Sequence, residues 1–106
     1  MARYFFSGGT MPSHGLLPAF RGDLTLEHDW RINGKYYART LEAWLANLDR
    51  RKAKVHSVLS EYYPSEEVDE WLQRWRIFFM ACAELFAFDK GRAWGVSHYL
   101  FSKPTT

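Results

Sequence analysis

Residues 68–86 read VDEWLQRWRIFFMACAELF and carry the most regular pattern in the chain. Apolar side chains recur there three and four residues apart, which places them on one face of an α-helix. Ser65 is the expected N-terminal cap of this helix, and Lys90-Gly91 is its expected stop. The pattern predicts a long amphipathic helix whose apolar face consists of Val68, Trp71, Leu72, Trp75, Phe78, Phe79, Cys82, Leu85 and Phe86.

A second helix is predicted upstream, from Ala38 to about Leu59. It ends at Tyr62-Tyr63-Pro64, because the residue before a proline avoids helical geometry. Its apolar face has the same helical spacing and comprises Leu41, Trp44, Leu45, Leu48, Val55 and Leu59.

Two segments alternate with the period of two that is typical of a half-buried strand. In 24–32 the residues expected on one side are Leu24, Leu26, His28, Trp30 and Ile32. In 93–101 they are Trp94, Val96, His98 and Leu100. Asn33-Gly34 predicts a turn after the first strand, and residues 13–20 predict a short helix that stops at Gly22. The expected fold is an α+β unit of one short helix, two strands and two long helices; that the two strands are antiparallel is implied by the resemblance described below.

Composition narrows the class of protein. A chain of 106 residues makes one domain, and 47% hydrophobic residues with 18% aromatic residues exclude a disordered tail. Two strands alone are marginally stable, so five Trp in so short a chain suggest a core shared with a larger sheet. A net charge of +2 does not favour nucleic acid as a partner. The single Cys82 and the absence of a long apolar run predict a reducing compartment, with the cytoplasm as the default.

No catalytic site can be assembled from these residues alone. His28 and His98 are expected to be core histidines, Cys82 a packing residue, and Gly8-Gly9 a turn. No glycine-rich loop follows a strand, so no nucleotide fingerprint is present. The run Arg50-Arg51-Lys52-Ala53-Lys54 leaves two interpretations open, a solvated helix face or a contact with anionic lipid head groups.

Four stretches resemble a known family. They are residues 4–13 (YFFSGGTMPS), residues 36–44 (YYARTLEAW), Trp75-Arg76 followed by residues 81–86 (ACAELF), and residues 100–104 (LFSKP). In this order they are similar to motifs in the C-terminal part of the cyclopropane-fatty-acyl-phospholipid synthases and the mycolic acid cyclopropane synthases. The resemblance covers nearly the whole chain and implies that residues 1–106 are the C-terminal portion of a Rossmann-like methyltransferase domain.

The resemblance implies methyl transfer from S-adenosylmethionine to the double bond of a phospholipid acyl chain, with bound bicarbonate as the base. Tyr37 aligns with a tyrosine that holds the bicarbonate in that family. The family's cofactor loop and its other bicarbonate ligands lie upstream and are absent here. We therefore expect no cofactor binding and no turnover by this chain alone.

The expected partners are acyl chains at the membrane surface and the upstream part of the enzyme or a paralogue, with no nucleic acid. The expected location is the cytoplasm or the periphery of the inner membrane surface. The alternative is a non-catalytic helical module that binds a lipid surface or an intact paralogue. In either case we expect the isolated chain to be marginally stable and to expose apolar surface.

Overall fold

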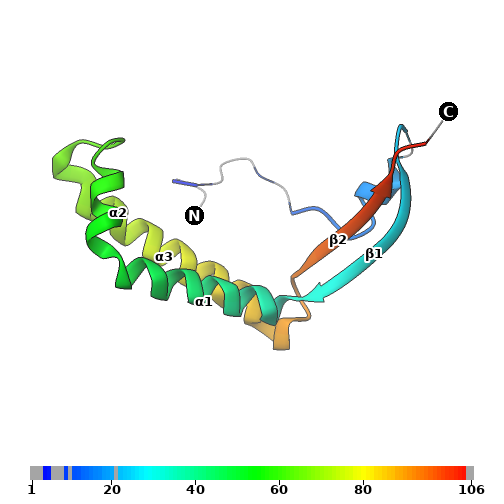
Figure 1. Cartoon of the computed structure of the whole chain (residues 1–106). Helices are drawn as coiled ribbons and strands as arrows, with labels where there is room; N and C mark the ends of the chain where they lie inside the picture. The colour runs from blue at the N-terminus through cyan, green and yellow to red at the C-terminus, as the bar shows by residue number, and fades with distance from the viewer. Residues whose placement is uncertain (1–3, 6–8, 10, 21, 105–106) are drawn as a thin grey trace. The chain divides into compact units, whose positions relative to one another are not determined.

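The computed structural model describes residues 4–5, 9, 11–20 and 22–104 (Figure 1). Its contacts divide the chain into a helical unit, Asn33–Gly95, and a strand unit that comprises Met1–Ile32 and Val96–Thr106. The strands are β1 (Thr25–Asn33) and β2 (Gly95–Ser102), and the α-helices are α1 (Gly34–Arg50), α2 (Lys52–Leu59) and α3 (Val68–Ala87). Short 3₁₀ turns are η1 (Leu17–Ala19), η2 (Ser65–Glu67) and η3 (Phe88–Gly91). The α+β class predicted from the sequence is confirmed.

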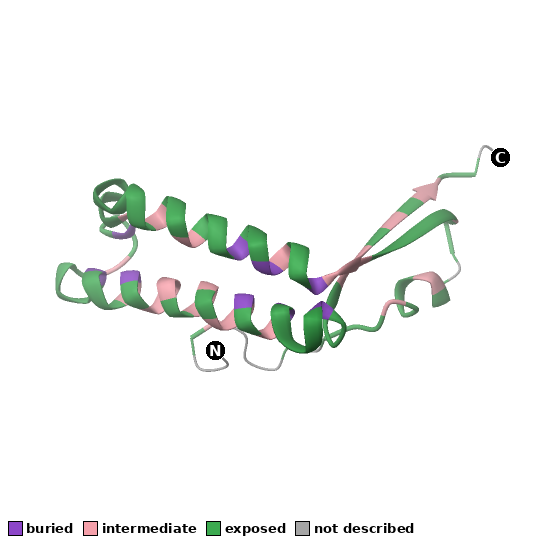
Figure 2. Cartoon of the chain, turned by 90° about the horizontal axis from the view of Figure 1, so that it is seen from below, coloured by how far each residue is buried: buried purple, intermediate pink, exposed green. Residues whose placement is uncertain are grey.

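In the helical unit, α1 and α3 lie side by side and run in opposite directions (Figure 1). Every residue of the apolar face predicted for 68–86 is buried or half-buried, so that prediction is confirmed. Most of the ribbon is nevertheless exposed, and the buried positions are few (Figure 2). They form two clusters, one of Ala38, Leu41, Ala83 and Phe86, and one of Leu59, Val68 and Leu72.

The single helix predicted from Ala38 to Leu59 is wrong, because the structure has two helices that meet at Arg51. The backbone there has φ −109° and ψ 33°, outside the helical region, while its N–H still donates to the carbonyl oxygen of Asn47. After this break, Leu59 at the end of α2 packs into the cluster with Val68 and Leu72. The apolar spacing of residues 38–59 does not indicate this break.

The turn predicted at Asn33-Gly34 is also wrong, since these residues begin α1. Asn33 caps the helix by accepting a hydrogen bond from the backbone N–H of Lys35 at 2.8 Å. Its Nδ2 donates to the carbonyl oxygen of Lys90 at 3.2 Å. A Cβ atom on Gly34 would lie 2.1 Å from the carbonyl oxygen of Trp94. Glycine is therefore required here by the close approach of another part of the backbone.

The limits predicted for the last helix need correction at both ends. Ser65 lies in η2 and makes no capping hydrogen bond, and α3 begins three residues later at Val68. The helix ends at Ala87, ahead of the predicted stop at Lys90-Gly91. The three residues 89–91 then have positive φ angles of 53°, 57° and 78°.

In the strand unit, β1 and β2 pair as a two-stranded sheet, within two residues of the predicted limits. Of the side predicted to face the core on β2, Val96 is half-buried, but His98 and Leu100 are exposed. The opposite side, with Ser97, Tyr99 and Phe101, is the half-buried one. The segment around His14 covers this side, because the Tyr99 hydroxyl donates to the carbonyl oxygen of His14. On β1 only Leu26 and Ile32 of the predicted side are half-buried.

The short helix predicted for residues 13–20 is a turn followed by η1. The turn predicted at Gly8-Gly9 lies outside the described residues. No helix in the described part of the chain is long and apolar enough to cross a bilayer.

Candidate functional site

A row of aromatic rings follows the contact between α1 and α3. The Tyr37 ring meets Phe86 edge to face, with centroids 4.6 Å apart, and lies 6.1 Å from Trp44. Trp44 lies 6.1 Å from Phe79, which lies 6.0 Å from Trp75. These spacings are within the 4.5–7 Å that favours aromatic pairs. The two helices therefore hold five rings in fixed mutual positions, and we call Tyr37, Trp44, Phe79, Trp75 and Phe86 the aromatic row.

The row is partly open to solvent. Phe86 is buried, Tyr37, Phe79 and Trp75 are half-buried, and Trp44 is 46% exposed. Tyr37, the one site residue predicted from the sequence, thus lies inside the row near the start of α1. Its hydroxyl group makes no hydrogen bond to another residue in the described ranges. The structure therefore shows the contacts of the Tyr37 ring with Phe86 and Trp44 and leaves the role of its hydroxyl untested.

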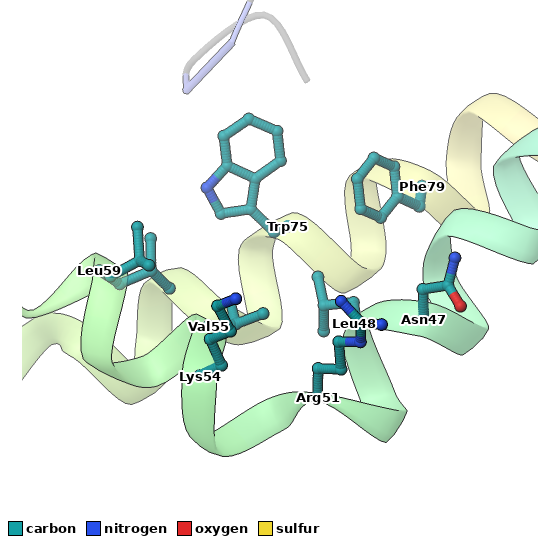
Figure 3. A pocket seen from close by; sticks show the side chains of 9 residues that line it. Asn47, Leu48, Arg51, Lys54, Val55, Leu59, Trp75 and Phe79 are labelled. Carbon is teal, nitrogen blue, oxygen red and sulfur yellow. The ribbon is translucent and has the colours of Figure 1, made fainter.

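A groove of about 430 Å³ opens beside the Trp75 end of the row (Figure 3). Its walls come from α1 and α2 on one side and from α3 on the other, and they include Leu48, Val55, Leu59, Trp75 and Phe79. This size falls within the range of small-molecule sites, roughly 300–1,000 Å³.

Two cations lie at this groove, Arg51 at the break between α1 and α2 and Lys54 one turn later. The neighbouring Arg50 does not line the groove, but its guanidinium donates to the side chain of Asn47, which does. No ion pair or side-chain hydrogen bond of Arg51 or Lys54 occurs within the described residues. Part of the basic run noted in the sequence therefore borders an apolar groove.

An ion pair between α1 and α3 holds the two walls together. Arg76 donates from Nε to Oδ1 of Asp49 at 2.7 Å and from Nη2 to Oδ2 at 3.2 Å. This hydrogen bonding by Arg76 lowers the pKa of the Asp49 carboxyl below its ordinary value. The same contact raises the pKa of Arg76. The paired charges therefore position the helices and leave the groove's cations unneutralised.

The strand unit contains a polar cluster that the sequence did not reveal. Nδ1 of His14 shares a hydrogen bond with the Ser97 hydroxyl at 2.7 Å, and Nε2 lies 3.6 Å from Oδ1 of Asp29. The ring also stacks on Tyr99, with centroids 5.4 Å apart. The contacts with Ser97 and Tyr99 join residues 83 and 85 positions apart, and no local motif signals such a contact. The cluster attaches the segment around His14 to both strands.

The other residues considered from the sequence do not form a catalytic site. His28 and His98 are exposed, so the prediction that they are core histidines is wrong. Cys82 is half-buried in α3, as predicted, and burial raises the pKa of its thiol, which disfavours the nucleophilic thiolate. No group of three His, Cys, Asp or Glu side chains in the described ranges is arranged to hold a metal ion.

Comparison with known proteins links this chain to methyltransferases. No protein-family model matches it. (S)-coclaurine N-methyltransferase of Papaver somniferum is 35% identical over 103 residues, which is 94% of this chain and 29% of that enzyme. Pavine N-methyltransferase of Thalictrum flavum subsp. glaucum is 29% identical over 103 residues, with the same two coverages.

A solved structure shows the same similarity to N-methyltransferases. The crystal structure of coclaurine N-methyltransferase bound to N-methylheliamine and SAH matches with a TM-score of 0.74 and 30% identity, over 88% of this chain and 28% of that one. The chain thus spans less than a third of the length of the relatives it matches. It is similar to part of enzymes named as N-methyltransferases, and its fold matches a fragment of the methyltransferase that was crystallised with SAH.

Proposed function

We propose that residues 1–106 are the C-terminal portion of an S-adenosylmethionine-dependent N-methyltransferase, in which α1 and α3 line the site of the nitrogen acceptor. The observation that carries this proposal is the aromatic row. It lies on a segment that is 35% identical to part of an enzyme named an N-methyltransferase. The non-catalytic module is not favoured, because the similar proteins are named as enzymes.

The aromatic row suits the positive charge that moves from donor to acceptor in nitrogen methylation. A nitrogen lone pair attacks the methyl carbon of the sulfonium donor, the carbon–sulfur bond breaks, and the positive charge passes from sulfur to nitrogen. A nitrogen that carried a hydrogen then loses it as a proton. Aromatic faces attract such cations by about 0.5–2 kcal/mol each, and packed rings exclude water. Trp44, the most exposed ring of the row, is the residue we expect to contact the acceptor.

The described residues do not fit a site for the methyl donor itself. Its adenosine and amino-acid ends would need buried polar partners, and no polar or charged side chain in the described ranges is buried. We therefore propose that the donor is bound by the upstream part of the same enzyme or by a paralogue. Alone, this chain would transfer no methyl group.

An acyl double bond is the second acceptor class to test, because four motifs resemble cyclopropane synthases. In that reaction the proton to be removed comes from the new methyl carbon, and the Tyr37 hydroxyl would help to hold the bicarbonate that takes it. In nitrogen methylation no proton leaves the methyl carbon, so this role for Tyr37 applies only to the acyl reaction. Acyl chains at a membrane surface are the partners in this second case.

A chimera tests both acceptors. The chain replaces the matching 29% of the Papaver (S)-coclaurine N-methyltransferase, and transfer of a labelled methyl group is measured to secondary amines and to unsaturated phospholipids. We expect transfer to an amine, with a reduction of about tenfold or more in Trp44→Leu and little change in Tyr62→Leu, an exposed aromatic residue outside the row.

Three other results would redirect the proposal. Transfer to the phospholipid alone, lost in Tyr37→Phe, would favour the acyl reaction. A folded chimera that binds the donor but methylates neither acceptor would favour the interaction module. Calorimetric titration of the unfused chain with S-adenosylmethionine should show no binding, and binding would mean that the donor site lies in these residues.

A further inference from the structure

We propose that the groove between α2 and α3 binds a long-chain carboxylate, with the alkyl chain on the apolar walls and the carboxylate between Arg51 and Lys54. This inference is independent of methyl transfer. It rests on the geometry of the helical unit alone, and binding can be measured without a donor or an acceptor.

The walls of the groove suit an alkyl chain. Val55 and Leu59 face Trp75 across it, and Val58, which also lines it, is 47% exposed (Figure 3). Apolar side chains left open to water are stabilised when another apolar surface covers them. Apart from Asn47, Arg51 and Lys54, every lining residue is apolar. A polar ligand would therefore leave most of its own groups without partners.

The charges of the groove select the head group. Both charged residues that line it are cations, and no Asp or Glu side chain lies among the lining residues. The nearby acid Asp49 is already paired with Arg76 through two hydrogen bonds. A protonated amine would be repelled here and a neutral alcohol would leave both cations unused. A carboxylate can accept the paired N–H groups of an arginine as well as a lysine ammonium.

The position of the cations explains how one ligand can contact both the apolar walls and the two positive charges. Arg51 lies at the break between the helices, and Lys54 follows three residues later in α2, so the two lie on neighbouring turns. In Figure 3 both side chains come from the same wall as Val55, opposite Trp75 and Phe79. One wall of the apolar groove is thereby positive.

The test is calorimetric titration of the 106-residue chain with dodecanoate below its micelle concentration, beside dodecanol, dodecylamine and dodecyl phosphate. We expect dodecanoate to bind most tightly and the double variant R51Q/K54Q to weaken it by about tenfold or more. Binding of dodecanol should change less than about twofold in that variant. The matched control is K35Q/R39Q, which removes the same charge from two α1 positions that do not line the groove and should leave dodecanoate binding unchanged.

A second variant addresses the wall without touching the core. Val58→Asp places a carboxylate on an exposed groove position and should abolish dodecanoate binding while the circular dichroism spectrum stays the same. The proposal would be overturned if the two double variants lost the same affinity for dodecanoate, or if dodecylamine bound as tightly as dodecanoate. Tighter binding of dodecyl phosphate would overturn the choice of a carboxylate. Binding to anionic vesicles without binding to monomeric dodecanoate would replace the groove with a membrane surface as the site.

Discussion

Replacement of Gly34 by alanine gives opposite predictions from helix propensity and from the packing around this residue. Gly34 is the first residue of α1, and alanine is favoured over glycine in a helix by at most about 1 kcal/mol. By that measure Gly34→Ala would stabilise the chain. In the structure, however, the new methyl group would lie 2.1 Å from the carbonyl oxygen of Trp94 and 2.4 Å from that of Phe86.

The size of the clash decides whether Gly34→Ala stabilises or destabilises the chain. Carbon and oxygen atoms that touch without bonding lie about 3.3 Å or more apart, so the methyl group overlaps two backbone oxygens by about 1 Å. Neither oxygen can rotate away as a side chain would, and the start of α1 would have to move from the end of α3. Overpacking of this kind costs about 1–3 kcal/mol or more. Because two backbone oxygens clash with the methyl group, we take the upper end of this range, about 3 kcal/mol. Subtraction of the gain of about 1 kcal/mol in helix propensity leaves an expected net loss of about 2 kcal/mol in the free energy of unfolding.

The assay is guanidinium denaturation followed by circular dichroism and tryptophan fluorescence. Gly22→Ala is the matched control, because a methyl group there meets nothing within 4 Å. Its free energy of unfolding should stay within about 0.5 kcal/mol of the parent chain. If Gly34→Ala proves as stable as the parent, the close approach of the three backbone segments is wrong.

Three further predictions follow from the helical unit. Leu72 is 1% exposed, and Leu72→Ala should lower the free energy of unfolding by about 2–5 kcal/mol. Ile77 is 61% exposed, and Ile77→Ala should change the free energy of unfolding by less than about 0.5 kcal/mol. Similar losses of stability in the denaturation curves of the two variants would contradict the assignment of the core. Asp49→Asn should lower the denaturation midpoint at pH 7. The pKa of Asp49 is lower in the folded chain than in the unfolded chain. Its carboxylate therefore stabilises the fold above the pKa of the unfolded chain, about 3.9, and this stabilisation is lost as the pH falls through the pKa of the folded chain. A difference in stability between parent and variant that persists at pH 2 would argue against the ion pair with Arg76. Cys82 should react with a thiol reagent more slowly in the folded chain at pH 7–8 than in the denatured chain, since burial raises its pKa; equal rates would show that the thiol is not protected.

The spacing of apolar residues predicted a helix or strand well where the same period continues through the whole segment. The apolar face of 68–86 is repeated over five turns, and the structure buries or half-buries all of its members. The strand limits were also close, because alternation is a property of neighbouring residues. The aromatic stretch that contains Tyr37 was recognised through its similarity to known motifs, and the proposed role of Tyr37 stays a prediction.

The sequence by itself determined the α+β class, the helical face of α3 and the homology to a methyltransferase segment, because these depend on residue order and short-range spacing. The tertiary structure alone decided the break at Arg51, the required glycine at position 34, and the contact of His14 with Ser97. It also placed Arg51 and Lys54 across an apolar groove from Trp75, which makes one wall of the groove charged. Each of these features depends on groups brought together from distant positions or on packing between elements, and no local period records such a contact.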